Sequence, residues 1–169
     1  MLTTASPTIV GPADGASVTL QTIGVRFMIP GADTDTRLSL VEHPIPPRAL
    51  AAPLHRHNRE DEYSYVLKGR MGALLGDDVV YAEVGETVFK PRDQWHTFWN
   101  AGDEPALILE LISPGGFEQF FAELAPLTGG GAPDPEAIDE LCRRYALEMR
   151  PEALPELCVR FGLWFPGVE

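Results

Sequence analysis

Short segments rich in Val, Leu, Thr, Tyr and Phe, separated by turn-forming residues, make up the chain from about residue 8 to residue 112. Segments of this composition are typical of β-strands. The expected strands are Ser17–Gln21, Ile23–Ile29, Thr36–Glu42, Glu62–Lys68, Met71–Leu75, Val79–Ala82, Thr87–Lys90, His96–Trp99 and Ala106–Ile112. Many short strands with nothing helical between them predict an all-β sandwich or barrel and argue against a βαβ fold.

The spacing of apolar residues becomes helical after a Ser-Pro-Gly-Gly turn at residues 113–116. One apolar helix face is expected from Phe117, Phe120, Phe121 and Leu124. The glycines of residues 129–131 should end this helix and form a flexible link. Asp134, followed by a proline, is a good N-cap for a second helix. We therefore expect a β-barrel over residues 1–114 and a helical extension over residues 115–169.

The extension contains an internal duplication. Residues 135–150, PEAIDELCRRYALEMR, align without gaps to residues 151–166, PEALPELCVRFGLWFP, with eight of sixteen positions identical. The duplication predicts two similar short helices. Cys142 and Cys158 occupy equivalent positions in it, which indicates small buried apolar residues rather than metal ligands or a disulfide.

The overall charge limits the classes of partner. The 169-residue chain has 25 acidic and 13 basic side chains, a formal charge of −12. Nucleic acids and anionic membranes bind basic surfaces, so neither is an expected partner. The chain shows no signal-peptide pattern, and its apolar runs are too short to span a bilayer. With two cysteines and no C-x-x-C pair, a reducing cytoplasmic location is expected.

Three of the four histidines fall in one pattern, which carries the candidate chemistry. His55 and His57 are two residues apart, so on an extended strand both imidazoles point to the same face. Glu62 follows after a short connection, and His96 begins a later strand. Three imidazoles and a carboxylate suit one divalent transition metal such as Fe, Mn, Ni, Cu, Co or Zn, whereas Ca and Mg prefer oxygen ligands.

Two spaced motifs extend this pattern. The first contains His55, His57, Glu62 and Gly69, and the second contains Gly85, Pro91, His96 and Asn100. In this arrangement residues 35–112 resemble the cupins, and the layout up to Phe121 resembles small single-domain cupins akin to quercetin dioxygenases. Two motif glycines are replaced, by Ala49 and by Asp93, and the second change is mild because Asp tolerates left-handed geometry.

The cupin resemblance implies a double-stranded β-helix, or jelly-roll barrel, with a metal on His55, His57, Glu62 and His96. It also implies a metal-dependent dioxygenase of a small organic substrate, with aromatic compounds among the candidates, in which Glu62 serves as a base as well as a ligand. Strand parity alone suggests Ser64 and Phe98 as pocket residues. His43 matches no motif position, so a local hydrogen bond is its expected role.

Several alternatives remain open from the sequence. Related cupins with the same ligands act as isomerases or lyases on sugars or keto acids. A non-enzymatic ligand-binding barrel is a third hypothesis, beside the dioxygenase and the isomerase or lyase. The C-terminal helices either pack statically on the barrel or form a lid, and static packing is preferred. A homodimer is plausible through the apolar outer-face residues Tyr63, Tyr65, Trp95 and Trp99. The scattered basic residues, including Lys90, are expected to be solvated, and Glu60 is expected in an exposed turn.

Overall fold

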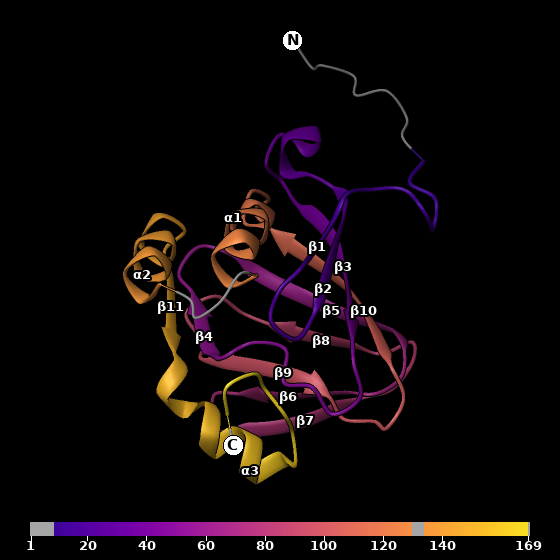
Figure 1. Cartoon of the computed structure of the whole chain (residues 1–169). Coiled ribbons are helices and arrows are strands. Elements are labelled where there is room, and N and C mark those ends of the chain that lie inside the picture. Colours follow the sequence, from indigo (N-terminus) through magenta and orange to yellow (C-terminus); the bar gives the residue numbers. More distant parts are fainter. Residues whose placement is uncertain (1–8, 130–133, 169) are drawn as a thin grey trace.

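Two antiparallel sheets face each other in the computed structural model, which describes residues 9–129 and 134–168 (Figure 1). The six-stranded sheet has the order β1 (Ser17–Thr19), β2 (Gly24–Ile29), β3 (Ser39–Ile45), β10 (Ala106–Ser113), β5 (Asp61–Lys68) and β8 (Thr87–Lys90). The five-stranded sheet has the order β11 (Leu147–Arg150), β4 (Leu54–His57), β9 (His96–Asn100), β6 (Met71–Leu75) and β7 (Asp78–Ala82). The predicted all-β jelly-roll barrel is therefore confirmed.

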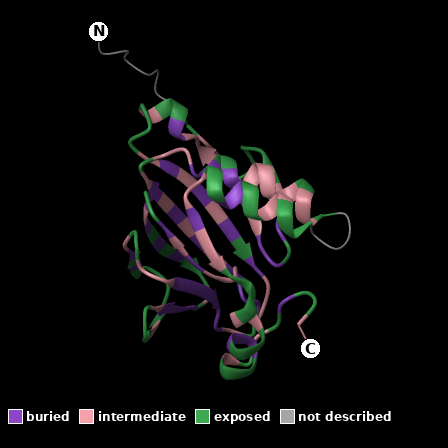
Figure 2. Ribbon diagram, turned by 90° about the vertical axis from the view of Figure 1, so that its left-hand side faces the viewer, coloured by how far each residue is buried: buried purple, intermediate pink, exposed green. Residues whose placement is uncertain are grey.

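Buried and exposed residues alternate along the strands, as the banding in Figure 2 shows. In β5, Ser64 and Val66 are buried while Tyr63 and Tyr65 are exposed. This is the two-residue periodicity of a sheet with one face on the core. It follows that every second residue of β5 faces the interior, as the sequence predicted.

The predicted strands agree with the observed ones except at their ends. The largest shift is in β3, which was expected from Thr36 and begins at Ser39. A 3-10 helix, η1 (Gly31–Thr34), precedes it, and Asp35 and Thr36 then take left-handed φ angles of 53° and 58°. A left-handed backbone cannot continue a strand, so the strand starts later.

Three α-helices follow the barrel strands: α1 (Glu118–Thr128), α2 (Pro135–Arg144) and α3 (Leu154–Phe161), the last preceded by the 3-10 helix η2 (Pro151–Ala153). The predicted cap of α2 is present, since the carboxylate of Asp134 accepts a hydrogen bond of 3.0 Å from the amide of Glu136. Of the predicted glycine link, residues 130 and 131 lie outside the described residues. In Figure 1 the extension runs from α2 through β11 to α3 along one side of the barrel.

The two copies of the duplicated sequence also have similar structures as far as the ends of α2 and α3. Ala146 and Gly162 occupy equivalent positions and have left-handed φ angles of 52° and 63°. The two copies then differ, because the first continues as β11, which pairs antiparallel with β4. The sequence analysis predicted only helices in the duplication and so missed this strand. Cys142 and Cys158 are free and buried, as predicted, and burial raises the pKa of Cys142 to about 11.

The two tryptophans near His96 pack against residues of the C-terminal extension. Trp99 is 1% exposed and stacks on Phe161 of α3 with ring centroids 4.4 Å apart. Trp95 is half-buried, with the Arg150 guanidinium 3.9 Å from its ring centroid. The C-terminal extension thus covers both residues. Among the described residues, no helix is both long enough and apolar enough to cross a membrane.

Candidate metal centre

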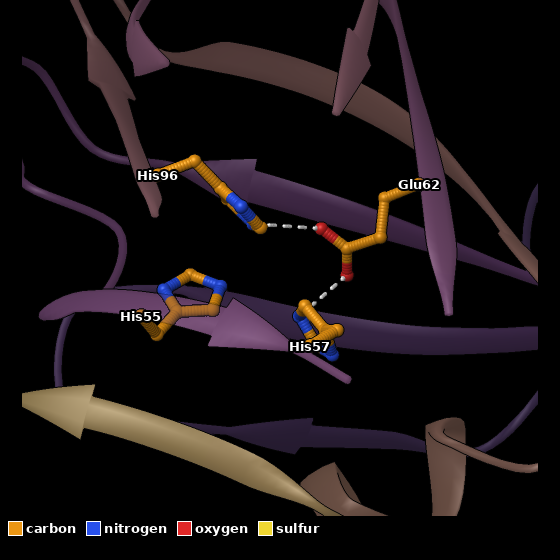
Figure 3. Close-up of side chains that lie close together, drawn as sticks. All are labelled: His55, His57, Glu62 and His96. Carbon is orange, nitrogen blue, oxygen red and sulfur yellow. Dashed lines mark ion pairs between the residues drawn. The ribbon is translucent and has the colours of Figure 1, made fainter. Parts of the chain in front are cut away.

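Two adjacent strands of the five-stranded sheet and one strand of the facing sheet bring the four predicted ligands together inside the barrel (Figure 3). His55 and His57 lie on β4, Glu62 lies on β5, and His96 of β9 is the direct cross-strand partner of His55. One potential ligand atom from each residue lies within 4.8 Å of those of the others, and all four residues are buried. Such convergence of three imidazoles and a carboxylate is a suitable shell for one transition-metal ion.

Backbone hydrogen bonds orient two of the imidazole rings. Nδ1 of His55 lies 2.8 Å from the carbonyl of Pro53, and Nδ1 of His96 lies 3.0 Å from the carbonyl of Gln94. Because a carbonyl only accepts, each Nδ1 carries the proton and each Nε2 keeps a free lone pair. The tautomers fixed in this way are those that a metal ion facing Nε2 requires.

Two buried nitrogens at this point, Nε2 of His57 and Nε2 of His96, have no hydrogen-bond partner. Burying a polar atom without a partner costs about 1–3 kcal/mol. Glu62 lies near two of the imidazoles, with Oε1 3.4 Å from Nε2 of His57 and Oε2 3.3 Å from Nε2 of His96. A cation between these atoms would satisfy them, so the residues fit a metal ion.

The protonation states also fit metal binding. Burial lowers the pKa of His55 well below its usual value, and it lowers the pKa of His96 as well. Although burial acts in the opposite direction, the positive charge of Lys90 and the nearby imidazoles hold the pKa of Glu62 well below its usual range. Neutral imidazoles and an ionised carboxylate are the forms that bind a metal.

A buried lysine lies beside the cluster, and the sequence analysis misplaced it. Lys90 was expected to be solvated, but its side chain is fully buried and its Nζ lies 2.8 Å from Oε2 of Glu62. Nζ also donates a hydrogen bond of 3.0 Å to Oε2 of Glu110. The signal was present in the sequence, because Lys90 is two residues after the apolar Val88 in β8 and so faces the same side.

Glu110 is a second functional candidate that sequence reasoning missed. Burial raises the pKa of Glu110 to about 7, against the lowering effect of Lys90. Its Oε2 also accepts a 2.8 Å hydrogen bond from Ser64. Glu110 occupies an inward position of β10, between the buried Ile108 and Ile112. Its inward orientation was therefore readable from the alternation, but its pairing with a lysine from another strand was not.

Glu60 is not in an exposed turn, as had been expected. It is 7% exposed, and its Oε2 lies 3.6 Å from Nδ1 of His57. It therefore stands behind His57 on the side opposite Nε2, where a carboxylate orients the ring of a metal ligand. Its neighbour Asp61 does lie at the surface side of the strand, where it forms an ion pair of 2.7 Å with Arg92.

The two predicted pocket residues, Ser64 and Phe98, face the interior, where they contact Lys90 or its partner Glu110. The Ser64 hydroxyl is engaged with Glu110, and Nζ of Lys90 lies 4.5 Å from the centroid of the Phe98 ring. Their contact with a substrate stays a prediction. His43 has the predicted local hydrogen bond, with Nδ1 3.2 Å from the carbonyl of Gly24.

The two departures from the motif glycines are accommodated in different ways. Asp93 takes a left-handed φ of 63°, which its glycine counterpart would adopt without strain and which Asp tolerates. Ala49 is fully buried and has no positive φ, so this position requires no glycine conformation. Neither replacement disturbs the four clustered ligands.

One of the four clustered residues lines a cavity. His55 lines a cavity of about 70 Å³, together with Phe117, Phe120 and other apolar residues. The ring of Phe117 also packs edge-on against His57, with centroids 4.3 Å apart. Residues from α1 and β11 therefore form part of the wall beside the candidate metal centre.

The chain is a small jelly-roll barrel with a buried cluster of three histidines and one glutamate that could hold a metal ion. Residues 42–112 match the family model described as the cupin domain. The matched segment is similar to a cupin domain and contains all four clustered residues, in agreement with the cupin resemblance of the sequence motifs. No curated protein matches the chain.

Solved structures share this fold. KdgF from Halomonas sp. has 17% identity and a TM-score of 0.59, covering 68% of this chain and 99% of that one. An RmlC-like cupin from Shewanella frigidimarina has 15% identity and a TM-score of 0.57, covering 68% of this chain and 96% of that one. The polyketide cyclase RemF from Streptomyces resistomycificus has 26% identity and a TM-score of 0.54, covering 64% of this chain and 80% of that one.

Proposed function

We propose that this protein is a metal-dependent enzyme that acts on a small organic substrate, with one divalent transition metal held by His55, His57, Glu62 and His96. The observation that carries the proposal is the convergence of these four ligand atoms within 4.8 Å in a buried site. When bound, a metal with four protein ligands has open positions and supplies Lewis-acid or redox chemistry.

The protein's own residues would prepare the site for this chemistry. The Pro53 and Gln94 carbonyls hold the imidazoles of His55 and His96 in the ligating tautomer. Lys90 holds one oxygen of Glu62 through their 2.8 Å ion pair. The Phe117 ring and the barrel wall exclude water from the reacting atoms, which strengthens electrostatic interactions there. The role of Glu62 as a base, implied by the cupin resemblance, belongs to this proposal as well.

Dioxygenation of an aromatic substrate is the first reaction that we propose for this centre. It follows from the resemblance of the sequence motifs to quercetin dioxygenase-like cupins. The apolar residues that line the cavity next to His55 support a substrate with little charge. A barrel closed around the reacting atoms would also keep water away from a reactive intermediate.

A second reaction class is favoured by the similarity to the polyketide cyclase RemF at 26% identity. In this alternative the chemistry is metal-assisted and needs no dioxygen, as in an isomerisation, lyase or ring-closing reaction. It would use the same four ligand residues. The two candidates therefore differ in whether dioxygen is consumed.

The distinguishing experiment measures conversion of a panel of hydroxylated aromatic compounds by the metal-loaded protein in air and under anaerobic conditions. Stoichiometric oxygen uptake, lost in His57→Ala and retained in His43→Ala, is the result expected for a dioxygenase. Conversion that persists without oxygen identifies the second reaction class. If the metal-loaded protein converts none of the panel under either condition, the enzymatic proposal is contradicted in favour of a non-enzymatic ligand-binding barrel.

A further inference from the structure

The C-terminal extension contributes a strand directly beside the metal ligands. In the antiparallel pair of β11 and β4, Met149 is opposite His55 and Leu147 is opposite His57. Residues directly opposite each other in a sheet have side chains on the same face. Leu147 and Met149 therefore lie on the ligand side of the sheet, and Figure 3 shows β11 running next to β4 below the two histidines.

The small cavity at His55 adjoins a larger groove, with which it shares several lining residues. A groove of about 820 Å³ runs between the extension and the barrel, and it shares Gln21, Leu124, Leu147 and Met149 with the 70 Å³ cavity. We call the cavity and the groove together the apolar channel. Its volume falls within the roughly 300–1,000 Å³ of ligand pockets. Of the four ligand residues, only His55 lines it.

The size of the small cavity limits what can reach the metal centre. A cavity of about 150 Å³ accommodates benzene, as in a lysozyme variant. The cavity at His55, at about 70 Å³, admits less than one complete ring. A ligand would therefore place only one edge beside His55, while its body lies in the wider groove between α1, α2 and β11.

The charges along the channel do not favour an anionic ligand. Two of the charged residues at its outer end are neutralised by partners, Glu148 by Arg56 at 2.9 Å and Arg143 by Glu140 at 2.6 Å. Asp139 adds a negative charge and Arg150 a positive one. Together with the chain's net charge of −12, this pattern selects against carboxylates and phosphates.

From these observations we infer that the apolar channel is the substrate-binding site, formed in large part by the C-terminal extension, and that its ligand is an uncharged, apolar compound of more than one ring. The compound presents one edge to the metal centre at His55 and is held along its body by Leu124, Leu147 and Met149. This inference rests on the proposed function for its metal centre, but it assigns the specificity to residues outside the cupin motifs.

The test uses the full chain loaded with zinc and the uncharged fluorophore N-phenyl-1-naphthylamine as the probe. Its fluorescence rises on transfer to an apolar site, so a titration gives the Kd. Leu124→Trp fills the channel from α1, and Gln21→Trp narrows it from an exposed position that should leave folding intact. Val159→Trp adds the same side chain at a residue that is 81% exposed and outside the channel.

We expect both channel variants to weaken binding of the probe at least tenfold, and the Val159→Trp control to bind as the wild type does. Replacing zinc by the paramagnetic Mn²⁺ should broaden the probe's NMR resonances, because the bound probe lies near the metal. Equal affinity in all four proteins, or no broadening in manganese-loaded protein, would overturn the inference.

This result is separable from that of the proposed function. Metal content and turnover measured on the same samples report on the enzyme, whereas the Kd of the probe reports on the channel. Metal-dependent turnover that is unaffected by Leu124→Trp and Gln21→Trp contradicts the channel and leaves the enzyme proposal intact. Probe binding that is sensitive to both variants in a protein that takes up no metal contradicts the enzyme proposal alone.

Discussion

Nζ of Lys90 lies 2.8 Å from Oε2 of Glu62, so a buried cation contacts one of the four clustered ligand residues. The same Nζ lies 3.0 Å from Oε2 of Glu110, and no part of the lysine side chain is exposed. Two carboxylates and one ammonium group thus share the interior of the barrel. The charge of Lys90 offsets the repulsion that Glu62 and Glu110 would otherwise exert on each other.

Replacing this lysine should strongly destabilise the protein. Lys90→Met leaves two buried carboxylates without their cation, and breaking a buried ion pair on one side typically costs about 3–5 kcal/mol. We expect a decrease of that size in the free energy of unfolding, measured by urea denaturation of the metal-free protein. The exposed Lys68→Met is the matched control and should change stability by less than about 0.5 kcal/mol. Equal stability of the two variants would show that Lys90 is not needed to balance the interior charges.

Glu60 should increase the affinity of the centre for metal without being a ligand. Its Oε2 lies 3.6 Å from Nδ1 of His57, on the side of the ring away from Glu62. Carboxylates in this position typically contribute about 10–100-fold to metal affinity. We expect Glu60→Gln to weaken zinc binding by at least about tenfold in competition with a chelator. Glu104→Gln, at an exposed position, should bind zinc as the wild type does, and an unchanged affinity in both would rule out this role for Glu60.

His43 should make the stability of the protein depend on acid pH. Burial lowers its pKa from 6.5 to about 4, so the folded state binds the proton less well than the unfolded state. This difference in proton binding does not reduce the free energy of unfolding above pH 6.5. As the pH falls from 6.5 toward 4, it lowers the free energy of unfolding by about 3 kcal/mol. The free energy of unfolding of metal-free wild type and His43→Gln, measured between pH 8 and 4, should show a steeper loss for the wild type. Parallel curves would contradict the assigned pKa.

A homodimer remains a proposal, and the structure indicates where to test it. Tyr63, Tyr65 and Phe89 are each exposed by between 37% and 48% on the outer face of β5 and β8, where Tyr63 stacks on Phe89. Exposed apolar patches of this kind often mark interfaces. Light scattering should give twice the 18.5 kDa mass of one chain, and Tyr65→Glu should reduce it to that of one chain. A monomeric wild type would exclude this association.

The barrel and its ligand cluster could be predicted from the sequence because both depend on local periodicity and motif spacing. The two-residue alternation gave the inward orientation of Ser64, and the H-x-H spacing gave that of His55 and His57. The position of Glu60 was mispredicted because its burial depends on the packing of a turn against His57. The β11 strand was missed because its residues continue a helical repeat, and only the free edge of β4 selects the extended form.

The buried charges and the channel could not be predicted, because both depend on contacts between segments that are distant in the sequence. Lys90 and Glu110 come from strands that are adjacent to β5 on opposite sides, so their pairing depends on the strand order of the sheet. The channel is formed by residues as far apart as Gln21 and Met149. Contacts between such distant segments have no periodic signal in a single sequence.

The most direct test of the central claim is the metal content of the purified protein and of two matched histidine variants, determined by elemental analysis after reconstitution. His57 belongs to the cluster, whereas His43 is an equally buried histidine with a backbone hydrogen bond and no place in it. We predict about one transition-metal ion per chain in wild type and His43→Ala, and little in His57→Ala. Equal metal content in the two variants, or none in the wild type, would contradict a metal centre at His55, His57, Glu62 and His96.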